Sequence, residues 1–138
     1  MLKTLIVATA AAAALLASPA AAQNPTGVAL VLAQLDAASS EMGLAAGART
    51  TGRLARSGSQ TVNLQGLAGA SYVIGVCDEN CRDLDLVVRD SAGREIGRDM
   101  ATDDVPVISV SGAAGPYTVE VSMADCAGRC HWGVGVFR

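Results

Sequence analysis

The sequence predicts a mainly β fold, an antiparallel β-sandwich or jelly roll of about eight strands preceded by one helix. Three observations support this prediction. From Thr51 onward, apolar residues recur with a period of two in short segments rich in β-branched residues. Gly, Asp, Asn or Pro stands in nearly every gap between these segments, as tight turns require. Two CxxxC pairs fall between predicted strands, where disulfides would fasten the corners of a small exported domain.

Residues 1–22 have the organisation of a cleaved export signal. Lys3 supplies a positive start, residues 5–16 form an apolar core, and Ala20, Ala21 and Ala22 supply the small residues that precede cleavage. A transmembrane anchor is the alternative, but the apolar run is short for a span and its flank does not resemble a stop-transfer segment. We therefore expect a periplasmic or secreted protein with no membrane span after signal cleavage.

The charge of the exported part argues against a nucleic-acid partner. Lys3 is the only charged residue in the leader, so cleavage moves the formal net charge from −3 to −4, and every remaining cation is an arginine. Phosphate binding needs an excess of clustered Lys and Arg. Residues 23–138 are enough for one small domain with a modest core, and disulfides would supplement that core.

Residues 23–50 are expected to form a helix and linker ahead of a β-sandwich domain at 51–138. Asn24 or Thr26 is available as an N-cap, and Pro25 is tolerated only near a helix start. A narrow stripe recurs at helical spacing and ends at glycines: Val28, Leu32, Leu35, Ser39 and Met42, then Gly43 and Gly47. We expect one helix of about four turns that lies across a sheet. A partly disordered linker is the alternative.

The predicted strands span residues 52–57, 60–64, 71–76, 83–90, 95–98, 105–110, 117–123 and 132–137. Two of them alternate clearly, which predicts one buried and one wet face each. The expected buried faces carry Leu84, Leu86 and Val88 in one strand and Tyr117, Val119, Val121 and Met123 in the other.

Four cysteines stand at the predicted strand ends. Cys77 ends one strand and Cys81 precedes the next, and Cys126 and Cys130 hold equivalent places. Sequence allows three pairings. We favour Cys77 with Cys81 and Cys126 with Cys130, because a short loop at a strand end can bring two Cα atoms within disulfide range. Each small loop would contribute about 2 kcal/mol of stability.

Three sharper interpretations of these residues compete with the disulfides. A zinc site could use all four cysteines, or three of them with His131, although thiols of exported proteins tend to oxidise. A redox motif is weaker, because the spacing is not CxxC. His131 as a general base lacks an accompanying GxSxG, HExxH or free nucleophilic cysteine.

Acidic residues are concentrated between Asp78 and Asp104, where nine of them face four arginines. Carboxylates crowded on loops are the ligands that Ca²⁺ prefers, although no EF-hand loop is present. The sequence thus makes calcium a candidate cofactor, with Asp78, Asp83, Asp85, Asp99, Asp103 and Asp104 as candidate ligands. The alternative is that the arginines of this segment pair with these carboxylates on a solvated face: Arg82, Arg89, Arg94 and Arg98.

Residues 83–123 resemble the bacterial pre-peptidase C-terminal domain, whose members share a DxDL strand, a turn, an Asp-rich loop and a GxYxVxV strand. The matching pieces are DLDL at 83–86 and GPYTVEV at 115–121. The resemblance implies a jelly-roll-like β-sandwich in an exported protein, often with bound calcium, that assists secretion, stability or substrate attachment. It also implies Asp83 and Asp85 as cation ligands. The two CxxxC pairs, and the lack of a preceding peptidase domain in this sequence, depart from the family pattern.

We expect a non-catalytic protein with a binding or structural role and a protein or an envelope or extracellular polymer as its partner. A carbohydrate-binding module is one alternative, with Trp132 as its aromatic contact, because Tyr72, Tyr117 and Phe137 are expected in the core. A small secreted hydrolase is the other. In that case Asp83 and Asp85, two apart on one strand face, would act as acid and base.

Overall fold

The computed structural model describes residues 24–112 and 114–138, so the expected leader at 1–22 lies outside the described residues. Within this part of the chain, one helix precedes eight strands, and each predicted strand segment overlaps one observed strand. The elements are α1 (Gly27–Glu41), β1 (Ala46–Ala55), β2 (Ser59–Gly66), β3 (Gly69–Cys77), β4 (Cys81–Arg89), β5 (Glu95–Asp99), β6 (Val107–Gly112), β7 (Gly115–Cys126) and β8 (Arg129–Phe137).

The strands form two four-stranded antiparallel sheets, which we call sheet A and sheet B. Sheet A has the order β1-β8-β3-β6, and sheet B has the order β2-β7-β4-β5. Both sheets contribute side chains to one buried hydrophobic cluster, including Val73, Val134 and Val136 from sheet A and Leu86, Val88 and Val119 from sheet B. The mainly β, antiparallel prediction is therefore confirmed.

The period of two correctly identifies the buried faces of β4 and β7. Leu84, Leu86 and Val88 are fully buried, as are Val119, Val121 and Met123. Asp85 and Arg89 retain partial exposure on the opposite face of β4. Sheet B thus has one dry face and one face that meets solvent, as an antiparallel sheet commonly does.

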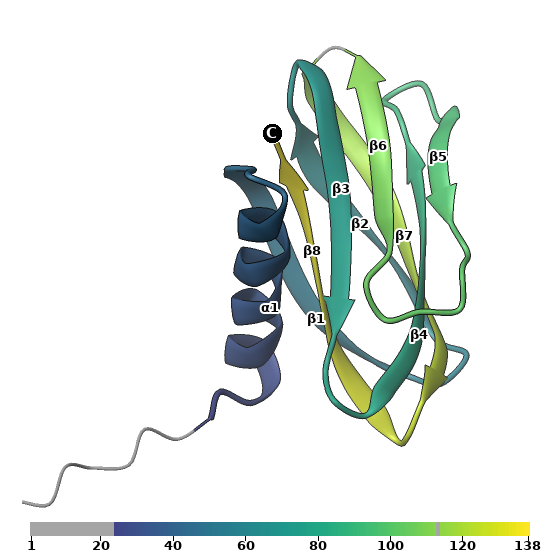
Figure 1. Ribbon diagram of the computed structural model, residues 1–138. Helices are drawn as coiled ribbons and strands as arrows, with labels where there is room; N and C mark the ends of the chain where they lie inside the picture. Colours follow the sequence, from purple (N-terminus) through teal and green to yellow (C-terminus); the bar gives the residue numbers. More distant parts are fainter. Residues whose placement is uncertain (1–23, 113) are drawn as a thin grey trace, which may run out of the picture.

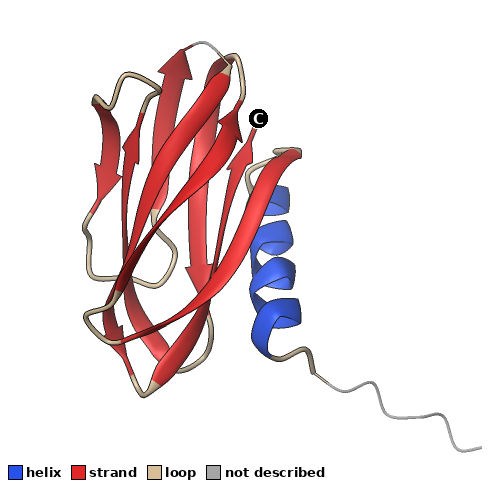
Figure 2. Cartoon of the chain, turned by 180° about the vertical axis from the view of Figure 1, so that it is seen from behind, coloured by secondary structure: helices blue, strands red, loops and turns tan. Residues whose placement is uncertain are grey.

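α1 lies across the outer side of sheet A and buries the middle of that face (Figures 1 and 2). Alternate residues of the edge strand β6 remain exposed there: Val107, Ser109 and Ser111. Val31 and Leu35 of the helix form a second buried cluster with Ile74, Val76 and Phe137 of the sheet. The expectation that the helix lies across a sheet is confirmed, whereas Phe137 packs under the helix and not between the sheets.

The helix contacts the sheet through a face slightly rotated from the predicted stripe. Leu35 and Ser39 are buried as expected, but Val28 and Met42 are 48% and 41% exposed. Val31 takes their place in the contact. The helix ends where the glycine predicts: Gly43 has φ +70°, and its N–H donates to the carbonyl of Ser40 at 3.0 Å.

The first strand begins earlier than expected, at Ala46 and not after Thr51. Small residues hide the period of two in this stretch. Pairing with β8 nevertheless supplies its backbone hydrogen bonds, in a register that runs from Ala46 opposite Phe137 to Ala55 opposite Arg129. Tertiary pairing, not side-chain pattern, therefore extends this strand.

Gly133 of β8 sets how closely α1 can approach sheet A. A Cβ at this position would lie 3.1 Å from Leu35 Cδ1 and 3.4 Å from Val31 Cβ. Trp132 and Val134, its neighbours, point into the space between the sheets and are fully buried. The glycine therefore leaves room on the outer face of β8 for the helix side chains.

We expect Gly133→Val to lower the free energy of unfolding by about 1–3 kcal/mol, because its methyl groups would overlap Leu35 and Val31. Gly133→Ala should cost less, since the tip of Leu35 can shift. Urea denaturation of both variants measures the difference. Adding Leu35→Ala to Gly133→Val should recover part of the extra loss. Equal losses for Ala and Val, with no recovery, would contradict the role assigned to helix packing.

Candidate functional site

Both predicted disulfides are present. Cys77 is bonded to Cys81 with a Cα–Cα separation of 5.8 Å, and Cys126 is bonded to Cys130 with a separation of 6.2 Å. The bonds occupy all four sulfurs, so no free thiol remains to bind zinc or to act as a nucleophile. The zinc interpretation is therefore overturned. A disulfide is also the oxidised state of a redox pair, so the case against a redox motif still depends on the spacing alone.

The two disulfide loops lie side by side at one end of the molecule. Each loop carries the chain between the sheets: β3 to β4 through the first and β7 to β8 through the second. Cys81 stands opposite Cys126 in the β4–β7 ladder. The Ala127 N–H also donates to the carbonyl of Asn80 at 2.9 Å.

Asp78 connects these two loops through its backbone and its side chain. Its N–H donates to the carbonyl of His131 at 3.0 Å, and its Oδ2 accepts the His131 N–H at 2.7 Å. Its Oδ1 accepts the Asn80 N–H at 3.1 Å. Because Asp78 is only 6% exposed, these bonds satisfy a buried carboxylate. Asp78, one of the predicted calcium ligands, therefore uses both carboxylate oxygens to hold the backbone of this corner.

His131 lies beside Asp78, with Nδ1 3.4 Å from Asp78 Oδ2 and a side chain 28% exposed. Gly27, at the start of α1, lies against the imidazole ring: a Cβ there would be 3.5 Å from His131 Nε2. The histidine therefore packs between the disulfide corner and the helix start.

Asp83 and Asp85 lie on the solvent-facing side of β4, next to other carboxylates. Irregular pairing around Arg82 and Ala124 places Asp83 opposite Asp125 of β7. Such bulges redirect side chains and are common next to functional sites. Asp125 is not among the ligands predicted from the sequence, because only the strand register brings it close to Asp83.

Burial, and then the charges of neighbouring carboxylates, raise the pKa of both side chains. For Asp83 the neighbours are Asp103 and Asp125, while the Asp103 N–H acts in the opposite direction on the pKa. For Asp85 they are Asp83, Asp99 and Asp103. The structure therefore brings together four of the six predicted ligands: Asp83, Asp85, Asp99 and Asp103.

The loop after β5 is held against this group by its own aspartates. Asp99 Oδ1 accepts the Ala101 N–H at 3.1 Å, and Asp99 Oδ2 accepts the Val107 N–H at 2.9 Å. The carbonyl of Asp103 accepts the Leu84 N–H at 2.9 Å, which ties the loop to β4. Asp104 is exposed and is not among the charges that act on Asp83 or Asp85.

Three of the four arginines of this segment pair with acids that are not candidate ligands. Arg89 pairs with Glu120 at 3.4 Å, Arg94 with Asp90 at 3.0 Å, and Arg98 with Glu95. No ion pair found within 24–112 and 114–138 involves Asp83 or Asp85. The expectation that these arginines neutralise the candidate ligands is therefore wrong for Asp83 and Asp85.

One oxygen on each of these two carboxylates has no partner. Asp83 Oδ1 and Asp85 Oδ1 are both buried and accept no hydrogen bond. As they stand, the described side chains of His, Cys, Asp and Glu include no group of three or more that could hold a metal ion. Any cation at this site would need further oxygen ligands from the backbone or from water.

Trp132 cannot serve as the exposed sugar contact expected from the sequence. It is fully buried, and its ring covers Gly52 of β1 so closely that a Cβ there would come within 2.3 Å of Trp132 Cζ2. Gly52 stands opposite Trp132 in the β1–β8 register. The indole therefore fills the space that a missing side chain leaves between the sheets.

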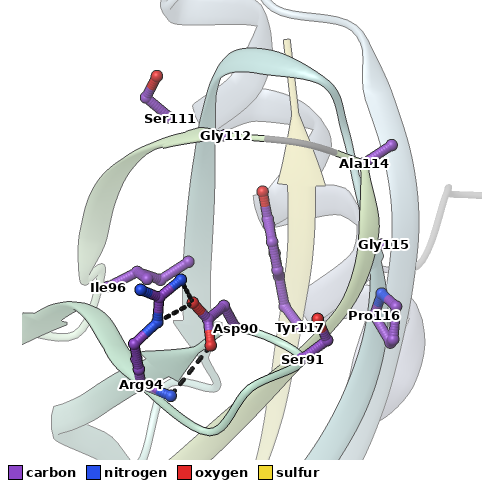
Figure 3. A pocket seen from close by; sticks show the side chains of 10 residues that line it. All are labelled: Asp90, Ser91, Arg94, Ile96, Ser111, Gly112, Ala114, Gly115, Pro116 and Tyr117. Atoms are coloured by element: carbon purple, nitrogen blue, oxygen red, sulfur yellow. Dashed lines mark hydrogen bonds and ion pairs between the residues drawn. The ribbon is translucent and has the colours of Figure 1, made fainter.

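A cavity of about 290 Å³ lies at the other end of the molecule, between the β4–β5 turn and the adjoining ends of β6 and β7 (Figure 3). Strand β7 runs from the cavity to the disulfide corner, since it starts at Gly115 beside the cavity and ends at Cys126. Neither Asp83 nor Asp85 lines this cavity.

No protein-family model matches the sequence, and a search of curated proteins finds no match either. Within the described ranges, no helix has the length and apolarity needed to cross a membrane. The fold and the site thus define a small, disulfide-fastened, mainly β protein with an acidic group on one sheet.

We expect Asp78→Ala to lower the free energy of unfolding by about 2–3 kcal/mol, because it removes hydrogen bonds to a charged, buried acceptor and leaves backbone N–H groups unsatisfied. Glu79→Ala is the matched control: Glu79 is the exposed neighbour, and its loss should stay within about 0.5 kcal/mol. Urea denaturation with both disulfides intact measures each value. Equal stability of the two variants would refute the linking role of Asp78.

Proposed function

We propose that this chain is an exported, non-catalytic β-sandwich protein of the jelly-roll type, with a binding or structural role and with calcium bound at its acidic group. The strand pairing supports the jelly roll: the first strand pairs with the last, the second with the seventh, the third with the sixth and the fourth with the fifth. This is the order expected when a long antiparallel ribbon is rolled into two sheets.

The observation that carries the calcium proposal is the pair of partnerless oxygens, Asp83 Oδ1 and Asp85 Oδ1. A buried carboxylate oxygen without a hydrogen bond or a cation is unfavourable. Burial, and then the charges of neighbouring carboxylates, raise both pKa values, and a divalent cation would oppose both effects because its charge stabilises the ionised forms. The residues that would hold the ion are Asp83 and Asp85, with Asp99 and Asp103 alongside.

Two further features support the assignment. Asp83 and Asp85 are the positions that match the DxDL strand of the pre-peptidase C-terminal domain, for which bound calcium is expected. A bound ion would also join β4 to the β5–β6 loop, whose backbone is already tied to it by the Leu84 hydrogen bond. Calcium would therefore stabilise the fold, not perform chemistry.

The proposed location outside the cytoplasm is supported by the disulfides, since such bonds form and persist in oxidising compartments. The outer face of sheet B is the surface we propose for the partner, a protein or an envelope or extracellular polymer. Helix α1 covers the corresponding face of sheet A. Polar side chains occupy the outer face of sheet B. Examples are Asn63 and Thr118, whose Oδ1 and Oγ1 atoms lie 3.4 Å apart.

A second candidate function is hydrolysis with Asp83 and Asp85 as acid and base, and their raised pKa values favour it. We rank it second, because such an enzyme places both carboxyls beside a substrate groove. The cavity that the structure shows lies at the opposite end of β7.

We expect calcium to stabilise the protein measurably. At about a hundredfold excess over its Kd, a ligand adds about 2.7 kcal/mol, or on the order of 10 °C in Tm for a domain of this size. Isothermal titration and thermal unfolding of EDTA-treated protein test this. The double variant Asp83→Asn, Asp85→Asn should lose the calcium response, and Glu41→Gln, an exposed control on α1, should keep it. Neither heat nor a shift in Tm at millimolar Ca²⁺ would refute the proposal.

Without calcium, the same double variant should be more stable than the wild type at neutral pH. Because the folded-state pKa of each aspartate is raised, folding favours its protonated form, and that stabilisation is lost as pH rises through the raised values. The advantage of the variant should therefore shrink as pH falls toward the ordinary aspartate range.

Urea denaturation in EDTA across this pH range measures the difference between the two proteins. The pKa values of Asp90 and Glu95 are lowered, mainly by the hydrogen bonds they accept. These two groups therefore favour folding more as pH rises, which is opposite to the effect of Asp83 and Asp85. Both proteins share them, so their effect cancels in the comparison. A difference that stays constant with pH would contradict the prediction.

A further inference from the structure

The cavity opposite the disulfide corner has a polar wall that is built from one turn. In the β4–β5 turn, Asp90 Oδ1 accepts the N–H groups of Ala92 and Arg94, each at 3.0 Å. Asp90 Oδ2 accepts Arg94 Nε at 3.0 Å and lies 3.0 Å from Arg94 Nη2. Figure 3 shows this pair on one side of the cavity and Pro116 on the other, with Tyr117 between them. The aspartate thus holds the guanidinium in place and neutralises it.

Tyr117 supplies an unsatisfied hydroxyl to the same cavity. The residue is only 4% exposed, and its Oη is buried without a hydrogen-bond partner. Its ring is fixed over Gly66, where a Cβ would come within 2.4 Å of Tyr117 Cζ. Figure 3 shows the hydroxyl directed toward Gly112 and Ala114 at the far side of the cavity.

Packing alone does not explain this hydroxyl. The ring belongs to the core cluster between the sheets, and phenylalanine would fill the same space. A buried hydroxyl without a partner is unfavourable, and native proteins rarely leave one so. A second such hydroxyl, Ser71 Oγ, is buried near the start of β3, at the same end of the molecule. Ser71 does not line the cavity, so Tyr117 is the residue whose hydroxyl is suited to a partner that enters from it.

The lining indicates the chemistry of that partner. Ser91 and Tyr117 contribute hydroxyls, which donate and accept hydrogen bonds, and Ile96 and Pro116 contribute apolar surface. Arg94 offers its remaining N–H groups, but its charge is balanced by Asp90. A lining with paired charges, hydroxyls and C–H surface favours a neutral ligand over an anion.

We propose that this cavity binds a small, neutral, polyhydroxylated molecule, such as one sugar unit at the end of a glycan, with Tyr117 Oη as a hydrogen-bond partner. The volume of about 290 Å³ accommodates one ring of this kind. Binding brings the ligand to the side of the cavity formed by Gly112, Ala114 and Gly115, where the hydroxyl lies. The affinity expected for a ligand of this size is roughly millimolar.

The test is an NMR titration of the mature chain, with both disulfides formed, using D-glucose, D-galactose and N-acetyl-D-glucosamine as probes and sodium acetate as an anionic comparison. At least one sugar should shift the amide signals of residues 90–96 and 111–117 in a saturable way. Tyr117→Phe should weaken that binding by about 3- to 10-fold, the effect of one neutral hydrogen bond, and leave Tm unchanged or higher. Tyr72→Phe is the matched control and should change neither, because Tyr72 lies in the cluster under α1.

Four results would overturn the proposal: no shifts with any sugar, shifts centred on another surface, acetate binding as strongly as the sugars, or unchanged affinity in Tyr117→Phe. Each titration is run once with calcium chloride and once with EDTA. The result for the cavity is thereby separated from the result for the acidic group on β4.

Discussion

The double connection at the disulfide corner is the constraint on which the rest of the structure depends. Two loops cross between the sheets there, and each is closed by its own disulfide. Asp78 joins them by reciprocal hydrogen bonds with the backbone of His131. Short disulfide loops alone restrict the unfolded chain only modestly. The buried carboxylate adds a link from the first loop to the start of β8, next to the second loop. At the same corner the β4–β7 register places Asp83 opposite Asp125.

The two sheets differ in how their outer faces are covered. The two central strands of sheet A, β8 and β3, are largely buried on both sides, because the inner face meets sheet B and the outer face meets α1. Alternation of Trp132 and Val134 with Gly133 in β8 allows both contacts, since large side chains fill the interior and the glycine admits the helix. Sheet B keeps one wet face. The acidic group therefore occupies the sheet that can tolerate partly hydrated charge.

The distribution of ion pairs explains why the acidic group stands out. Arginines at the turn and the edge of sheet B neutralise Asp90, Glu95 and Glu120. Among the ion pairs of the described residues, none involves Asp83 or Asp85, and their raised pKa values follow from burial and then from neighbouring carboxylates. The two proposed sites thus differ in kind. One concentrates negative charge, and the other, at the far end of β7, balances its charge and leaves a hydroxyl unsatisfied.

The sequence by itself determined the features that depend on near neighbours along the chain. The period of two in β4 and β7, the stop at Gly43 and the local pairing of Cys77 with Cys81 are set by residues a few positions apart, so pattern and spacing reveal them. Only the tertiary structure decided that Trp132 is buried over Gly52, that Asp125 faces Asp83, that the arginines pair elsewhere, and that Tyr117 meets a cavity. Each of these depends on which distant strands become neighbours and in what register, and a periodic pattern carries no information about that choice.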